Sequence, residues 1–144
     1  MFSKLLTYLA ISFFIALSTL HAIDNKEAVK KGNTIANVKQ NFTKDGGSSQ
    51  GLMLLEKAIN QSTNESIVAK NEILSLREEL QKVISSESFD KKQYMVIKSK
   101  INDVMMNSVN NKDKIMISLL KDLSFHDRKI VANILKNMLL VNSQ

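Results

Sequence analysis

At residues 123–128 the sequence reads Leu-Ser-Phe-His-Asp-Arg, between two long stretches whose apolar residues recur every three or four positions. Apolar residues at that spacing share one face of an α-helix, so both stretches are predicted helices. Ser124 is placed to accept a hydrogen bond from a free amide of the second helix, and Asp127 to accept one in return from the Ser124 amide. Leu123 is the last apolar residue of the first helix. The hexapeptide therefore predicts two helices joined by almost no loop.

The first of these helices is predicted to be long, because the apolar stripe that begins near Tyr94 continues to Leu123 with no Gly or Pro to stop it. Ser88 or Asp90 is placed to cap its start. The second helix is predicted from Phe125 to about Val141.

Upstream, the apolar residues of 51–59 predict a short helix, followed by a turn over 60–64. Ser62 and Glu65 have the spacing of a second capping box, which opens an amphipathic helix reaching Ile84. The chain has no Pro and four Gly, and strand patterns are absent. We therefore expect an all-α fold, a thin hairpin or cradle of three to four helices over residues 51–144, whose apolar stripe a second copy or a client would cover.

The N-terminus has the pattern of an export signal. Lys4 precedes the uncharged apolar run 5–20, and Ala22 offers the small residue that signal peptidase requires. Residues 1–22 are thus predicted to be a signal peptide or, if cleavage fails, a membrane anchor. We expect a periplasmic or secreted protein, or one tethered to the inner membrane and facing the periplasm. The polar residues 23–50 are predicted to form a flexible linker, and the alternative is a weak helix over 26–40, interrupted at Gly32.

Charge is unevenly distributed along the chain. The whole sequence carries a formal +6, and residues 89–144 alone hold ten basic and five acidic side chains. The C-terminal helices therefore present a mildly positive surface that would attract acidic polymers, anionic lipid or an acidic protein surface, unless it is simply a solvated lysine-rich face.

Composition excludes several classes of function. The chain has no Cys, which rules out disulfide scaffolds, thiol chemistry and Cys-type zinc sites. Ser118 and Lys121 have the spacing of a penicillin-binding Ser-x-x-Lys motif, but its partner motifs are missing, so we do not expect an enzyme. Scattered aromatic residues and predicted export argue against nucleic acid as a partner.

Metal binding has one candidate residue. His126, beside Asp127, is the only His that remains after signal cleavage, and Met138 or a dimer mate could add a ligand. The alternative is an ordinary residue in the first turn of a helix. No cofactor is predicted apart from such a divalent metal.

Phe89-Asp90 before the long helix, and Leu123-Ser124-x-x-Asp127-Arg128 before the last, resemble the family of the periplasmic Spy and CpxP chaperones and related heavy-metal-resistance and metal-sensor proteins. The second motif is similar to that family's Leu-Thr-x-x-Gln signature, with Ser for Thr and Asp for Gln. In the earlier copy, Gln61 stands before Ser62 where the family has Leu. Its metal-binding members carry more His.

The resemblance implies an antiparallel homodimeric cradle that acts without nucleotide as a chaperone or envelope-stress adaptor for non-native clients. A metal sensor or resistance protein on the same fold is the alternative, and a purely structural helical interaction protein a third. The residues implied to bind clients are Lys91, Lys98, Lys112, Lys121, Met105 and Met116. Arg128 is predicted to brace the helix joint through a carboxylate.

Overall fold

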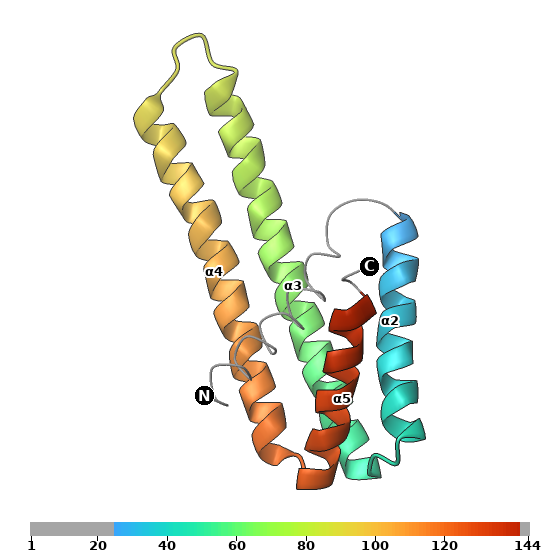
Figure 1. Ribbon diagram of the computed structural model, residues 1–144. Helices are drawn as coiled ribbons and strands as arrows, with labels where there is room; N and C mark the ends of the chain where they lie inside the picture. The colour runs from blue at the N-terminus through green and yellow to red at the C-terminus, as the bar shows by residue number, and fades with distance from the viewer. Residues whose placement is uncertain (1–24, 142–144) are drawn as a thin grey trace.

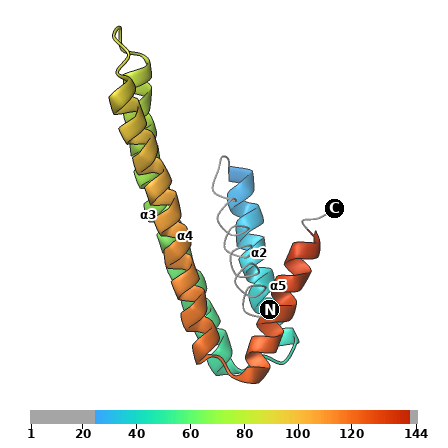
Figure 2. The ribbon, with the colours of Figure 1, turned by 60° about the vertical axis from the view of Figure 1, so that its left-hand side comes forward.

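The computed structural model describes the backbone of residues 25–141 and the side chains of residues 35–137, and over this part the fold is all-α, as predicted. The helices are α2 (Asn25–Lys44), α3 (Ser49–Ile84), α4 (Lys91–Asp122) and α5 (Phe125–Val141). α3 and α4 form a long antiparallel hairpin, and α2 and α5 lie together on one side of its lower half (Figures 1 and 2). The prediction for residues 1–22 lies outside the described residues.

None of the described helices combines the length and apolar character needed to cross a membrane.

All four helices meet in one hydrophobic core at the closed end of the molecule, which we call the base. Phe42 of α2 is fully buried there, and Leu55 of α3 and Met116 of α4 are almost fully buried. The other members of this core are Val38, Ala58, Ile59, Leu119, Leu123, Ile130, Val131, Ile134 and Leu135. Because every described helix contributes to it, the base is the part of the structure that hydrophobic burial stabilises most.

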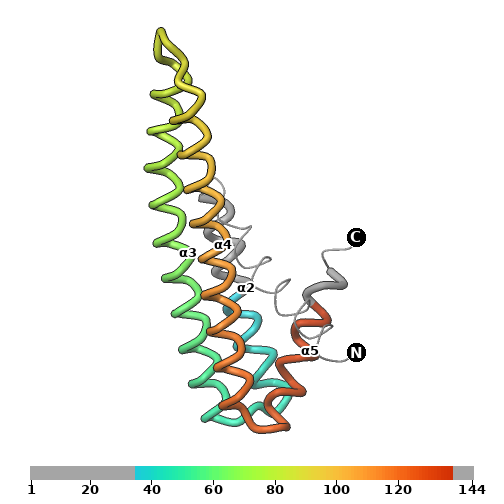
Figure 3. The backbone as a smooth tube through the Cα atoms, turned by 90° about the vertical axis from the view of Figure 1, so that its left-hand side faces the viewer, coloured from blue at the N-terminus to red at the C-terminus, as the bar shows by residue number. Residues whose placement is uncertain are grey.

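Beyond the base the hairpin continues as a two-helix arm, residues 67–109, which extends past α2 and α5 (Figure 3). Leu76 and Val83 of α3 pack with Ile97 and Ile101 of α4 in a second, smaller core. Small polar residues separate the two cores: Ser62, Ser66 and Ser108 are buried. The thinness expected from the sequence is therefore confirmed for the arm.

The predicted break in α3 is wrong. The helix runs without interruption through residues 60–64. Ser62 is buried inside it, and the Ser66 hydroxyl donates to the Ser62 carbonyl, 3.0 Å away. Glu65 accepts a hydrogen bond from Asn111 of α4, 3.2 Å away, and so does not close a capping box. Without Gly or Pro, packing against α4 decides in favour of continuous helix.

The predicted linker over 23–50 is also wrong, since residues 25–44 form α2. Ile35, Val38 and Phe42 are spaced three and four apart and lie on one face, which packs in the base. This stripe is too short to order a helix alone, but α3 and α5 supply the apolar surface that it needs.

The cap predicted before α4 is confirmed, and the capping box predicted before α5 is confirmed in part. Asp90 caps its start by accepting from the Gln93 amide at 3.0 Å. Leu123 ends the helix and is buried, as predicted, and the Ser124 hydroxyl accepts from the Asp127 amide at 3.1 Å. The Asp127 carboxylate, however, does not bond the Ser124 amide as predicted. It bonds the Ser124 hydroxyl and the residue before α3.

That carboxylate joins the starts of α3 and α5. Ser48, the N-cap of α3, donates to Asp127 through its amide, 2.9 Å from Oδ1, and through its hydroxyl, 2.7 Å from Oδ2. The Ser124 hydroxyl donates to Oδ2 at 2.8 Å. The Ser48 hydroxyl also accepts from the Gly51 amide at 2.9 Å, so one network caps both helices. We call these three residues, Ser48, Ser124 and Asp127, the carboxylate latch.

Gly51 makes room for the latch, and Gly46 forms the turn that precedes it. A Cβ on Gly51 would lie 2.7 Å from Oδ2 of Asp127 and 2.9 Å from the ring of Phe42, so a larger residue would push the helices apart. Gly46, with φ at 83°, adopts the left-handed conformation that turns the chain between α2 and α3.

Arg128 braces the joint, but not through a carboxylate as predicted. Its guanidinium donates to the carbonyls of Leu120 and Leu123, at 3.2 and 3.1 Å. These groups lie at the end of α4, where carbonyls lack partners within the helix. Arg128 therefore caps the C-terminus of α4 from the first turn of α5.

Asp127 should make the fold sensitive to acid. The hydrogen bond from the Ser48 amide lowers the pKa of Asp127, helped by the Ser48 and Ser124 hydroxyls and nearby His126, against an opposing effect of burial. Because the folded pKa is below the unfolded value, this stabilisation is present above about pH 4 and is lost as pH falls through the folded pKa. Replacing Asp127 by Asn should cost about 2 kcal/mol at neutral pH and flatten the melting temperature between neutral and acidic buffers.

The matched control is Asp103→Asn, at an exposed position of α4. This variant should keep the acid sensitivity of the parent chain. If the melting temperatures of the parent chain and of Asp127→Asn fell by the same amount as the pH is lowered, the proposed role of the latch would be wrong.

The Ser124 cap gives a second stability prediction. Ser124→Ala removes one acceptor and one donor and should lower the free energy of unfolding by about 1 kcal/mol. Ser118→Ala, on the exposed surface of α4, should leave it unchanged or slightly higher, since Ala is the better helix former. Urea denaturation of both variants measures the difference, and equal midpoints would show that the cap contributes nothing.

Candidate functional site

Two side-chain stripes run up the arm on the same side of the hairpin. On α3 the stripe follows positions 56, 63, 67, 70, 74 and 77, and on α4 positions 116, 112, 109, 105 and 98. Steps of three, four or seven residues keep side chains on one face of a helix. Both stripes begin on the side of the base that carries α2 and α5, because Glu56 pairs with α2 and Met116 belongs to the core shared with α2 and α5.

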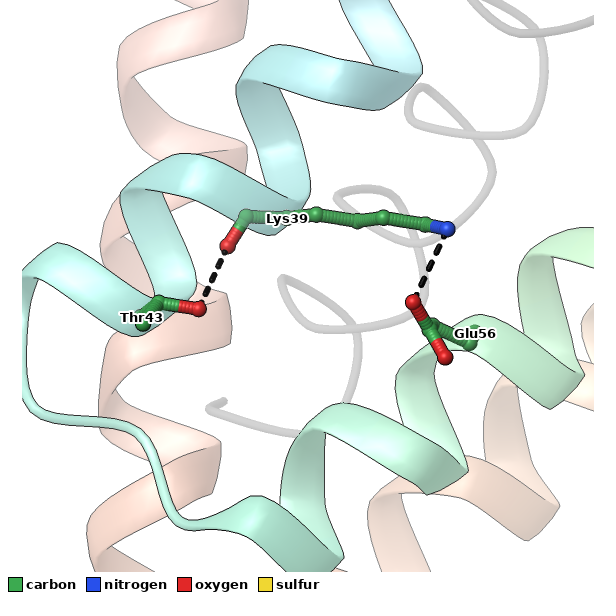
Figure 4. A network of polar contacts seen from close by, with 3 residues as sticks. All are labelled: Lys39, Thr43 and Glu56. Atoms are coloured by element: carbon green, nitrogen blue, oxygen red, sulfur yellow. Dashed lines mark hydrogen bonds and ion pairs between the residues drawn. The ribbon is translucent and has the colours of Figure 1, made fainter.

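The pairing at the base shows how a helix docks on this side. Lys39 of α2 lies 2.9 Å from the carboxylate of Glu56 (Figure 4). The residue before it in the sequence, Val38, is buried. Thr43, one turn further along α2, donates its hydroxyl to the Lys39 carbonyl at 3.1 Å. The docked helix thus buries an apolar stripe and places a charge at its margin.

The α4 stripe remains apolar beyond the base, where α2 and α5 no longer cover it. Met116 is 1% exposed beneath the base core, whereas Met105, three turns away on the same stripe, is 52% exposed. Val109 between them is half-buried. On α3, Ile67 and Leu74 are each 45% exposed. Apolar side chains therefore continue onto the arm along the face that other helices cover at the base.

Cations alternate with these apolar residues. Lys70 and Arg77 on α3 and Lys98 on α4 are exposed. The stripe positions between 67 and 109 hold no Asp or Glu, and Glu78, four residues from Leu74, is exposed at the margin of the α3 stripe. We define the inner face of the arm by seven residues: Ile67, Lys70, Leu74, Arg77, Lys98, Met105 and Val109.

The opposite edge of the arm has a different composition. It places Glu72, Glu79 and Asp103 beside Lys100, so both signs of charge are interspersed. A mixed edge of this kind is typical of a solvated surface. The inner face is distinct because it combines one sign of charge with exposed apolar side chains.

The structure separates the predicted client-binding residues. Lys98 and Met105 lie on the inner face, and Lys91 is exposed at the start of α4. Lys112 is 3% exposed and Met116 1% exposed, so neither is available on the surface as predicted. Met116 is buried because the base core brings side chains of α2 and α5 against that side of α4, which the periodicity of α4 alone does not reveal. Lys121 is exposed in the last turn of α4, away from the arm.

Sequence reasoning missed Lys70, Arg77, Ile67 and Leu74. By periodicity alone, Lys70 and Arg77 belong to the polar face of the amphipathic helix that ends at Ile84. Lys70 and Arg77 are seven residues apart, as are Ile67 and Leu74, and this spacing places all four on one side of α3. The spacing points to a binding surface only when the position of α4 shows that this side is exposed on the arm.

His126 lies outside the arm. Its Nε2 is 3.1 Å from the Gly46 carbonyl, so the ring contacts the turn between α2 and α3. Among the described residues, no three His, Asp or Glu side chains come together in a group that could hold a metal ion. The Met138 side chain is outside the described residues.

Comparison with protein-family models, curated proteins and solved structures finds no match to this chain.

Proposed function

We propose that the protein is an exported, ATP-independent chaperone or envelope-stress adaptor that binds non-native polypeptides through the inner face of the arm. The observation that supports this proposal most directly is the contrast between Met116, covered at the base, and Met105, uncovered on the same stripe. Non-native chains expose apolar side chains, which such a surface holds through nonspecific burial.

The neighbouring cations support the same proposal. Lys70, Arg77 and Lys98 would draw acidic segments of a client toward the face over about a Debye length, roughly 10 Å. Their long aliphatic stems add further apolar contact. Weak attraction combined with adaptable Met and Leu side chains suits many clients, since Met fills irregular contacts well.

Export is the part of the proposal that rests on the N-terminal sequence. Lys4 and the apolar run 5–20 support it.

The proposal is tested by aggregation of chemically reduced insulin, followed by light scattering, with and without the purified chain. Suppression should not require ATP and should be insensitive to a chelator. Leu74→Ser combined with Met105→Ser should raise the concentration needed for half suppression about tenfold, because two apolar contacts are lost.

The matched control is Val68→Ser combined with Val96→Ser, which removes exposed apolar side chains one turn from Glu72 and Lys100 on the opposite edge. Its effect should stay within about twofold. Both double variants should melt close to the parent chain, as surface substitutions usually do. Equal loss in the two variants would mean that the inner face is not the binding surface, and no suppression by the parent chain would overturn the proposal.

A further inference from the structure

The inner face carries enough pattern to specify the shape and charge of a partner. We propose that it docks an acidic amphipathic α-helix, which lies along the groove between α3 and α4 as a continuation of the layer formed by α2 and α5. This inference rests on the proposed function, in that it names the class of segment that the arm holds best.

The helical form of the partner follows from continuity with the base. There the same stripes of α3 and α4 are covered by helices, and α2 buries Val38 and Phe42 while Lys39 reaches Glu56, 2.9 Å away. The arm repeats the two-helix platform, and among the helices of residues 25–141 none lies beside its upper part (Figure 2). A helix is therefore the element whose dimensions this groove already accommodates in the same molecule.

The sign of the partner's charge follows from the change along the stripe. Glu56 at the base meets a lysine of α2, whereas on the arm the corresponding α3 positions are Lys70 and Arg77. A helix docked there in the same way must place carboxylates where α2 places Lys39. Charge complementarity thus selects Asp or Glu at the margin of the partner's apolar stripe.

The spacing of the cations specifies how far apart the carboxylates of the partner helix should be. Lys70 and Arg77 are seven residues apart, about 10.5 Å along α3 at 1.5 Å per residue. Lys91 and Lys98 repeat this spacing on α4. A helix with carboxylates seven residues apart on each margin, and apolar residues at the three-four spacing between them, would meet all four cations at once.

A second copy of the chain fits this face poorly. Two-fold packing of the inner face on itself would place two positively charged surfaces together, because every charged residue among its seven members is a cation. Like charges in such a contact oppose association. The charge pattern therefore favours a partner of different sequence.

The test uses three fluorescein-labelled three-heptad peptides and the full chain. The first carries Leu at the three-four spacing with flanking Glu, the second has Lys in place of every Glu, and the third is the Glu peptide with a central proline that breaks the helix. Fluorescence anisotropy at low and high salt gives the affinities. The Glu peptide should bind about tenfold more tightly than either of the others, and high salt should remove most of its advantage over the Lys peptide.

Charge reversal tests the residues. Lys70→Glu combined with Arg77→Glu should weaken binding of the Glu peptide about tenfold and make the Lys peptide the better ligand. The control, Lys100→Glu combined with Lys114→Glu, reverses two exposed lysines away from the inner face and should change neither affinity more than about twofold.

Each contrary outcome has a distinct meaning. Equal affinity for the Glu and Lys peptides would overturn the charge selection, and equal affinity for the proline peptide would overturn the helical form. Sedimentation that shows the peptide displacing a second copy would make a homodimer the occupant. If reduced insulin is protected but no peptide binds, this inference fails while the proposed function stands. If neither occurs, both fail.

Discussion

The structure depends on one buried carboxylate. Asp127 is 2% exposed and accepts three hydrogen bonds from Ser48 and Ser124, residues 79 and 3 positions away in the sequence. Burying a charge is costly unless donors surround it, and here the donors are the N-caps of two helices, whose dipoles also favour an anion. The latch therefore fixes the start of α5 against the start of α3, and with them the whole base.

A rigid base allows an arm that needs no cover of its own. Because all four helices share the base core, α3 and α4 leave it as a preformed pair, and the smaller core around Leu76 and Ile97 keeps them together. The buried serines between the two cores contribute little apolar stabilisation. The arm can thus expose Leu74 and Met105 on one face while the two cores keep the fold stable. A binding surface requires this arrangement.

The joint at residues 123–128 was predictable because its information is local. A capping serine, an acidic residue three positions later and two apolar stripes specify a helix end and a helix start within a few residues. The same local reasoning failed at Ser62, whose spacing to Glu65 imitates a capping box. It failed again for residues 25–44, because the apolar residues of α2 are too few to predict a helix until α3 and α5 are placed beside them.

The sequence by itself determined the all-α class, the long α4 and the position of the α4–α5 joint, since these follow from helical periodicity and capping along a continuous stretch of chain. Only the tertiary structure decided that Asp127 bonds Ser48, that Lys112 and Met116 are buried, and that Lys70, Arg77, Lys98 and Met105 share a face. These facts depend on which helices lie side by side, and burial is a property of neighbours that periodicity in one helix cannot specify.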